Sequence, residues 1–422
     1  MIVHRPELSE SRDGVTASAA VEVETRGRSD PGALWFEFPH SVGEFATSRA
    51  DAFAAALLPL AMHLGEPLTV HGGISCRLAR GLREYQQFQS SWKPTIFRVV
   101  ELRCDEVESR DPGEGGGGVG TAFSGGVDSF HTLRTHLAGN EPYPPYRISH
   151  CLLINGFDSD ADVAGAGFVP IQRVYEALMA RLGVQLVVVR TNLLQFLGEL
   201  LLKQSFAAFV TAPALALGRL FSRYYVPSSY RFTQLGPFPD GSHPMFDHLV
   251  GTETMETIHD GGHLTRVAKT LAIANWPETH DHLRVCFNAT GVQPGRGAIA
   301  NCCECEKCVR TMATLDVAGV LGNFRCFPKP LVRRNIRRLE YATPGSRVFA
   351  EEIVEYAARA GRRDVARDFR FAIAASLLYR RRLRSLMLAS YRLEQRAPRY
   401  AAVSRPTKRL IQRTGLFRGW LY

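Results

Sequence analysis

A six-residue segment rich in glycine and serine is the part of this 422-residue chain whose residue types most directly suggest chemistry. Two adjacent glycines let the backbone turn tightly, and the helical pattern that follows would present free N–H groups and a positive dipole end. A phosphate group is the natural occupant of such a turn. Asp128 could orient the amides at the helix start or hold a Mg²⁺ ion that bridges phosphates. The segment, called the glycine loop below, consists of Ser124, Gly125, Gly126, Val127, Asp128 and Ser129.

The spacing of the glycine loop fits neither the Walker-type pattern nor the dinucleotide-binding pattern. Its serines, Ser124 and Ser129, would add hydroxyl donors for phosphate oxygens. A glycine-rich turn that binds nothing is the alternative. The position directly after an apolar strand and before a helix favours the phosphate site.

Five of the nine cysteines lie within 23 residues, from Cys286 to Cys308. Cys302, Cys305 and Cys308 have the spacing CxxCxxC, which leaves a tetrahedral Zn²⁺ one ligand short. Cys286, sixteen residues before Cys302, is the predicted fourth ligand. Four-thiolate zinc sites are closed and structural, so the ion would fix a loop rather than activate water. Cys303 could replace Cys302 as a ligand, and an Fe–S cluster or unligated core cysteines are the alternatives.

These residues need a framework, and from residue 118 onward the chain alternates apolar strands with helices. The alternation is typical of an α/β fold with a parallel sheet that helices cover on both faces. Ligands collect at the carboxyl ends of such strands, where the glycine loop would lie. The predicted strands are 118–123, 147–154, 185–190 and 224–226, and the predicted helices are 128–137, 170–182 and 206–221.

The N-terminal part of the chain has a different pattern. Residues 1–32 are polar without periodicity and predict a flexible arm. Residues 33–110 contain strand-like segments and a helix-like segment, 48–65, which together predict a small α+β domain. The glycine run that follows, 111–118, predicts a flexible linker to a core of residues 119–327.

The C-terminal region, 328–422, carries the positive charge of the chain. It contains 23 Lys and Arg against 7 Asp and Glu, so its net charge of +16 leaves −6 for residues 1–327. Its pattern is helical, and its arginines alternate with aromatic residues, a combination that suits phosphate backbones and stacked bases. A tRNA or another nucleic acid is therefore one candidate partner. Docking on the acidic body of the chain, or on a second subunit as in a homodimer, is the alternative.

Composition and segment lengths predict a cytoplasmic protein. Hydrophobic residues make up 45% of the chain, as in packed globular domains, which excludes disordered and collagen-like classes. The segment MIVHRPELSE lacks the apolar region of a secretory signal. The longest uncharged stretch, 204–218, is shorter than the ~20 residues that a membrane-spanning helix needs.

The sequence SGGVDS of the glycine loop resembles the signature of the PP-loop ATP pyrophosphatases of the N type. The resemblance implies a Rossmann-like, doubly wound core in which the loop holds the pyrophosphate end of ATP. It also implies that a substrate oxygen attacks the α-phosphorus, giving pyrophosphate and an adenylated substrate that a nitrogen or sulfur nucleophile then displaces. Asn155 and Asp158, which follow the second strand, would border adenine or ribose; a plain Asn-Gly turn is the alternative there.

The loop and the cysteines together resemble the 7-cyano-7-deazaguanine synthases, which convert a carboxylate into a nitrile with ammonia and ATP. Leu264-Thr265-Arg266 is also similar to a Leu-Thr-Lys segment of that family. The resemblance implies that Arg266, with Lys269 as a second candidate, stabilises charge in the transition state. A solvated helix face is the alternative for both cations. The remaining matching residues are Ser124 to Ser129, Cys286, Cys302 to Cys308 and the pair Val309-Arg310.

The resemblance covers residues 119 to about 315, but it fails between Tyr224 and His282, so the substrate stays open. That segment is dense in histidine and acidic residues. His243 and Asp247 are the candidates to bind the substrate or to manage protons for an incoming amine. A solvated surface is the alternative for each.

The sequence therefore predicts an enzyme that adenylates a small molecule or a modified base. It would activate a carboxylate or carbonyl oxygen for attack by ammonia or an amine, with ATP, Mg²⁺ and Zn²⁺ as the implied cofactors. One alternative is a tRNA-modifying sulfur transferase with Cys303 or Cys326 as the sulfur carrier. A nucleotide-binding sensor without turnover is the other.

Overall fold

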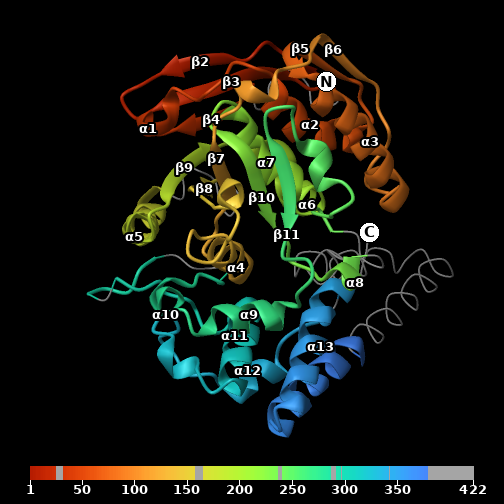
Figure 1. Cartoon of the computed structure of the whole chain (residues 1–422). Helices are drawn as coiled ribbons and strands as arrows, with labels where there is room; N and C mark the ends of the chain where they lie inside the picture. The colour runs from red at the N-terminus through yellow and green to blue at the C-terminus, as the bar shows by residue number, and fades with distance from the viewer. Residues whose placement is uncertain are drawn as a thin grey trace, which may run out of the picture. The chain divides into compact units, whose positions relative to one another are not determined.

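The computed structural model describes residues 1–24, 32–156, 165–235, 240–286, 291–295, 297–341 and 343–378. The chain divides into two compact units (Figure 1). The first comprises Met1–Cys302 and Asn323–Pro328, and the second comprises Cys303–Gly322 and the residues from Lys329 onward. The predicted N-terminal domain therefore belongs to the same unit as most of the predicted core, whose residues Cys303–Gly322 belong to the second unit.

Five parallel strands form the part of the sheet that the alternating pattern predicts. Along the sheet they are ordered β9-β8-β7-β10-β11, and each neighbouring pair is parallel. The chain adds β8 and β9 on one side of β7 and then β10 and β11 on the other, which is the arrangement of doubly wound sheets. The predicted α/β class is confirmed. The strands are β7 (Gly118–Ala122), β8 (His150–Asn155), β9 (Gln185–Thr191), β10 (Phe221–Pro227) and β11 (Glu256–Asp260).

Helices cover both faces of these strands. Successive side chains of a strand point to opposite faces. Tyr224 and Val226 of β10 belong to the buried cluster that contains the residues of α7, whereas Tyr225 stacks on His136 at the end of α4, with ring centroids 4.1 Å apart. One packed group consists of α4 (Val127–Thr135), α5 (Gly165–Leu182), α9 (Arg266–Ala274) and α10 (Pro277–His282), and the other contains α6 (Leu193–Gln204) and α7 (Phe206–Ala216).

The N-terminal strands extend the same sheet, so the prediction of a flexible arm over residues 1–32 was wrong for its described part, 1–24. β3 pairs antiparallel with β4, and β4 pairs antiparallel with β9. Alternate residues of β3 are buried, but Ala17 and Ala19 are too small to give a visible hydrophobic pattern. The strands are β1 (Ile2–Val3), β2 (Glu7–Glu10), β3 (Val15–Glu22), β4 (Ala33–Phe38), β5 (Leu68–Ser75) and β6 (Leu102–Glu108).

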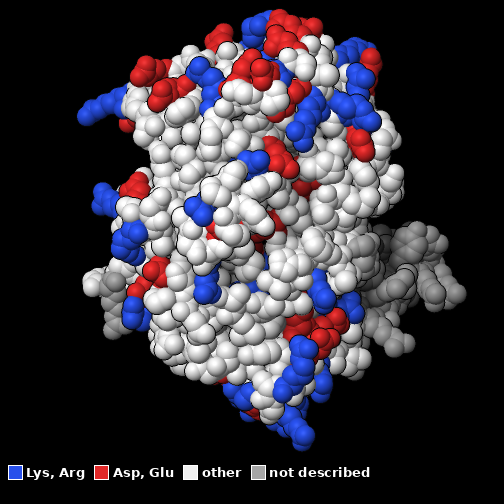
Figure 2. Space-filling view, in the orientation of Figure 1, with Lys and Arg blue, Asp and Glu red and all other residues white. Residues whose placement is uncertain are grey.

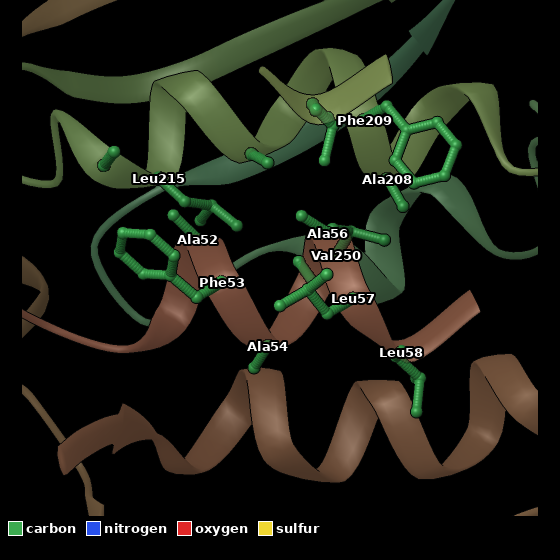
Figure 3. Packing of buried hydrophobic residues seen from close by; sticks show 14 of the residues in the cluster. Ala52, Phe53, Ala54, Ala56, Leu57, Leu58, Ala208, Phe209, Leu215 and Val250 are labelled. Atoms are coloured by element: carbon green, nitrogen blue, oxygen red, sulfur yellow. The ribbon is translucent and has the colours of Figure 1, made fainter. Parts of the chain in front are cut away.

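Helix α2 (Asp51–Leu64) shows why residues 33–110 do not form a separate domain. Its residues from Asp51 to Met62 are all buried, and a helix that is apolar on every side must be covered on every side. Figure 3 shows its small and apolar side chains packed close to α7, which carries Ala208, Phe209 and Leu215. The N-terminal segment and the core thus share one hydrophobic cluster. Further helices of this unit are α1 (His40–Gly43), α3 (Cys76–Trp92) and α8 (Phe232–Leu235).

The glycine run at 111–118 is packed, which corrects its prediction as a flexible linker. It forms a 3₁₀ turn over Pro112–Glu114 and leads directly into β7. A Cβ atom on Gly116 would lie 2.2 Å from the carbonyl oxygen of Leu220. One on Gly115 would lie 2.7 Å from that of Thr254. Glycine is needed here because backbone segments approach closely, and not because the chain must flex.

The second unit is helical, as the sequence predicts for the region after residue 328. Its buried Asp368 accepts hydrogen bonds from Nε of Arg333 at 2.6 Å and from Nε of Arg337 at 2.7 Å. Arg362 pairs with Asp316 at 2.8 Å. These arginines therefore help to hold the unit together. Its helices are α11 (Glu306–Val317), α12 (Arg333–Arg337), α13 (Pro344–Arg359) and a further helix over 363–378.

Figure 2 shows charges of both signs on the described surface, where Lys and Arg lie beside Asp and Glu at several places with uncharged surface between them. The predicted nucleic-acid partner rests on the basic region 328–422, of which residues 379–422 lie outside the described residues. Among the helices that the structure does describe, none combines the length and the apolar composition required to cross a bilayer.

Candidate functional site

The glycine loop lies between β7 and α4, beside the point where the strand order reverses. Gly126 is the N-cap residue of α4, so the free amides of the first helical turn lie at the carboxyl edge of the sheet. The Ser124 hydroxyl accepts a hydrogen bond from the Gly126 amide at 3.3 Å, and the Ser129 hydroxyl donates to the Gly126 carbonyl at 3.1 Å. Ser124 itself is exposed. The loop is therefore held by its own hydroxyls while one side stays accessible.

Replacing Gly125 with alanine should lower the free energy of unfolding by about 2–4 kcal/mol. Gly125 has a φ of 75°, and a Cβ atom there would lie 1.8 Å from the hydroxyl oxygen of Tyr175. The Tyr175 hydroxyl donates to the His282 carbonyl at 3.0 Å, so it has little freedom to move. Alanine at Gly126, where the nearest contact would be 3.2 Å to the Ser124 hydroxyl, is the matched control and should cost less. Equal losses in urea denaturation of the two variants would contradict this account.

The three predicted catalytic residues meet beside the loop. Arg266 Nη2 lies 2.7 Å from Asp128 Oδ2, and Lys269 Nζ lies 3.6 Å from Asp128 Oδ1. Thr265 caps α9 by accepting a hydrogen bond from the Ala268 amide, so Arg266 and Lys269 sit three positions apart in the first turns of that helix and share a face. A carboxylate and two cations thus converge on the helix start of α4.

Lys269 also connects the loop to the ends of two neighbouring strands. Burial lowers its pKa, and the nearby Asp128 carboxylate offsets part of that effect. Its ammonium group donates to the carbonyl of Ser228, directly after β10. Asp260, the last residue of β11, adds a further favourable charge. The cation is therefore fixed at the carboxyl edge of the sheet, which is where a ligand of a doubly wound fold would bind.

Asp260 fixes α4 against β11. Burial raises its pKa, but hydrogen bonds with His136 at 3.1 Å and from Thr132 at 2.6 Å outweigh burial and lower the pKa to about 2. The other ring nitrogen of His136 lies 2.8 Å from Glu141. Burial lowers the pKa of His136, yet the two carboxylates together raise it. This network anchors the helix that carries Asp128.

Replacing His131 with glutamine should make stability less sensitive to acid. His131 is 6% exposed, and burial lowers its pKa to about 4, with Asp260 opposing that shift and Lys269 adding to it. The unfolded side chain protonates near its ordinary value of about 6.5, so protons favour unfolding as the pH falls from there to about 4. Protonation of this imidazole should lower the free energy of unfolding of the native protein by up to about 3 kcal/mol over that range.

Urea denaturation at several pH values between about 7 and 4 tests this linkage. The glutamine variant should show a flatter dependence of unfolding free energy on pH. Replacement of the exposed His248 with glutamine is the matched control, because it also removes one histidine but does so at the surface. An unaltered slope in the His131 variant would show that this imidazole is not the acid-sensitive group.

Asn155 lies at the carboxyl edge of the sheet, as predicted for a residue near adenine or ribose. It ends β8 and is 5% exposed. The next residue, Gly156, has a φ of 119°, and a Cβ atom there would lie 2.1 Å from the Thr191 carbonyl. The other predicted contact, Asp158, lies outside the described residues. Nucleotide binding by either residue stays a prediction.

His243 and Asp247 lie in a packed region. Asp247 is fully buried and accepts hydrogen bonds from the Ser242 hydroxyl at 2.6 Å and from the His243 amide at 2.8 Å. His259 Nδ1 lies 2.7 Å from the same carboxylate. The His243 ring packs against Trp92, with centroids 4.8 Å apart. The protein itself thus occupies both carboxylate oxygens, and the geometry gives no support to a substrate-binding role for this pair.

The predicted metal ligands come together. The sulfur atoms of Cys286, Cys302, Cys305 and Cys308 lie within 4.8 Å of one another. Four thiolates at ~2.3 Å from one Zn²⁺ stand about 3.8 Å apart in a tetrahedron, so these four could hold a metal ion such as zinc. Cys305 directly precedes α11, whose N-terminal amides favour thiolates. Cys303, the alternative ligand in the sequence, is buried outside this group and has a φ of 63°.

Asn301 holds the segment before Cys286 in place, a role that no sequence pattern indicated. Its carboxamide oxygen accepts hydrogen bonds from the amides of Val285 at 3.0 Å and Cys286 at 3.2 Å. Its nitrogen donates to the carbonyls of Leu283 at 2.8 Å and Cys326 at 3.0 Å. The side chain is 2% exposed, so its hydrogen bonds are buried, and both its oxygen and its nitrogen have partners. Asparagine is common in turns, so its presence beside the cysteines predicts only a turn. The sequence therefore offered no sign that this side chain binds two segments of the main chain.

Two further residues at the glycine loop were not predicted. Tyr175 of α5 fills the space where a Gly125 side chain would stand. The Arg284 amide donates to the Gly125 carbonyl at 2.7 Å. The available signal was the position of Arg284 two residues before a predicted metal ligand, but only the fold brings that segment to the loop.

Comparison with known proteins found no relative: no family model, no curated protein and no solved structure matches the chain. A fold alone does not define an activity, because doubly wound sheets support many chemistries. The function must therefore be inferred from the residues at the carboxyl edge of the sheet.

Proposed function

We propose that this protein is an ATP-dependent adenylating enzyme of the PP-loop ATP pyrophosphatase type. It would split ATP into AMP and pyrophosphate and activate a carboxylate or carbonyl oxygen for attack by ammonia or an amine, as 7-cyano-7-deazaguanine synthases do. The observation that carries the proposal is the convergence of Asp128, Arg266 and Lys269 on the glycine loop at the strand-order reversal. Nucleotides bind doubly wound sheets at that point.

Each residue has a role that follows from its chemistry. The amides at the start of α4 and the exposed hydroxyl of Ser124 would bind the β- and γ-phosphates of ATP. The buried Ser129 hydroxyl, which donates to the Gly126 carbonyl, would hold the loop in shape. Arg266 and Lys269 would neutralise the charge that develops on the leaving pyrophosphate. Asp128 would hold these two cations in place and would supply a ligand oxygen to Mg²⁺, which would neutralise negative charge on the phosphates.

The cysteine cluster would have a structural part in this enzyme. A zinc site made of four cysteines is closed and leaves no position for a reacting water. Its ligands would tie the segment ending at Cys286 to the turn around Cys302, and that segment borders the glycine loop. The zinc would thus contribute to the shape of the nucleotide site without taking part in the reaction.

ATP–pyrophosphate exchange tests the proposal directly. Purified protein, Mg²⁺, ATP and labelled pyrophosphate would be screened against carboxylated small molecules, 7-carboxy-7-deazaguanine and tRNA. Exchange that depends on one of these compounds supports the proposal and identifies the acceptor class. Release of ADP and phosphate instead of AMP and pyrophosphate would overturn it, and tight ATP binding without turnover for any acceptor would favour a nucleotide sensor.

Sulfur transfer to tRNA is less well supported. A sulfur carrier needs a thiol that a partner enzyme and the substrate can reach. Cys303 is 1% exposed and Cys326 is 0% exposed, so both predicted carriers are buried. The tRNA partner, the homodimer and the cytoplasmic location stay predictions from the sequence.

A further inference from the structure

We propose that Arg284 binds phosphate at the glycine loop and that the cysteine cluster positions it there. The proposal rests on the nucleotide-binding role of the loop given above, and it names a residue that neither the loop sequence nor the Asp128 group includes. Arg284 lies in an irregular segment between α10 and Cys286. Its position depends on two sets of contacts, one on each side of that segment.

The first set joins Arg284 to the loop. Its backbone amide donates to the Gly125 carbonyl at 2.7 Å, and its Nη1 donates to the Ser124 carbonyl at 3.4 Å. A Cβ atom added at Gly125 would lie 3.2 Å from Cβ of Arg284. The arginine therefore runs along the first residues of the loop, and its guanidinium group reaches the accessible side where Ser124 is exposed.

The second set joins the same segment to the cysteines. Asn301 binds the main chain on both sides of Arg284, through the Leu283 carbonyl and the Val285 amide. It also binds the amide of Cys286, whose sulfur belongs to the cluster. Tyr175, which packs against Gly125, donates to the carbonyl of His282. The segment from 282 to 286 is thus fixed between the metal ligands and the loop.

The charges around the loop favour an anion. Arg266 and Lys269 already face the single carboxylate of the loop, Asp128. Arg284 adds a cation at the other end of the loop, and the start of α4 adds its positive dipole end. These positive groups suit the negative charge of a polyphosphate, and the planar guanidinium can donate two parallel hydrogen bonds to phosphate oxygens.

Equilibrium binding of ATP and of pyrophosphate, measured by calorimetry on the full chain with its metal content determined, tests the proposal. Replacing Arg284 with alanine should weaken binding about tenfold, and lysine should restore part of the loss. The matched control is Arg325→Ala, because Arg325 is an exposed arginine of the same unit that pairs with Asp281. That variant should bind as the native protein does. Native-like binding by the alanine variant at Arg284 would overturn the proposal.

The role of the cluster is tested by combining metal removal with the Arg284 variant. Chelation should weaken ATP binding in the native protein, yet it should add little in the Arg284→Ala variant, because the arginine is already absent. Additive losses would overturn the positioning role. Circular dichroism checks that each sample is folded. If the native protein binds neither ATP nor pyrophosphate, the proposed function itself is overturned. If the native protein binds and the Arg284 variant binds equally well, only the role of Arg284 is overturned.

Discussion

Asparagine in place of Asp128 should slow ATP–pyrophosphate exchange about a hundredfold or more. The carboxylate lies 2.7 Å from Arg266 and 3.6 Å from Lys269, so its loss removes the group that orients both cations. It also removes the negative ligand expected for Mg²⁺. Because asparagine has nearly the same shape, the packing around residue 128 should persist. The initial rate of exchange with saturating acceptor is the measurement.

The control for this experiment is asparagine in place of Asp13, an exposed carboxylate in the turn between β2 and β3. That variant should exchange at the native rate. Thermal unfolding of both variants shows whether the fold survives, since two cations now lack their carboxylate. Undiminished exchange by a folded Asp128 variant would remove the glycine loop from the proposed reaction.

Serine in place of Cys308 should abolish zinc binding and lower the free energy of unfolding by at least about 4 kcal/mol. Cys308 is fully buried within the cluster, and a serine hydroxyl is a poor ligand for zinc. The ion that would hold the remaining three sulfur atoms together would also be lost. Zinc per chain, measured by mass spectrometry, and urea denaturation together report both effects.

Cys302 and Cys303 provide a matched pair for the same measurement. They are adjacent in the sequence, but only Cys302 belongs to the cluster. Serine at Cys302 should therefore release zinc, whereas serine at Cys303 should retain it. The same zinc content in both variants would show that the four sulfur atoms do not act as one ligand set.

The parallel sheet was largely predictable, because apolar strands such as Gln185–Thr191 alternate with helices long enough to show a period. β11 was not, since Glu256–Asp260 is short and polar. Its His259 and Asp260 pair with groups outside the strand, Asp247 and His136, and a local pattern carries no information about such partners.

The N-terminal segment shows the opposite error, in which a signal was present but its consequence was missed. Helix Asp51–Leu64 has no polar face, so it must be covered on every side, and a domain of residues 33–110 is too small to supply that much apolar surface. The glycine run before β7 was interpreted as flexible because sequence alone does not distinguish a glycine that bends from one that makes room. The carbonyl of Leu220 close to Gly116 decides between them.

Within the candidate site, the sequence identified those functional residues that lie close together along the chain. CxxCxxC and the loop sequence are such groups of residues. Resemblance supplied Arg266 and Lys269, which the structure places beside Asp128. Asn301 and Arg284 could not be found in this way, because each acts through backbone contacts that only the folded chain creates. His243 and Asp247 were chosen for local density of polar residues, which says nothing about whether the protein already uses them.

The pairing of β4 with β9 also means that part of the sheet cannot form until much of the chain has been synthesised. Glu37 pairs with Arg190, 153 positions later, so at roughly 5–20 residues per second a ribosome needs about 8 to 30 seconds to supply that partner. Throughout that interval α2, made early, lacks the α7 surface that covers it. The nascent chain therefore exposes an apolar helix and an open strand edge before the residues that cover them have been synthesised.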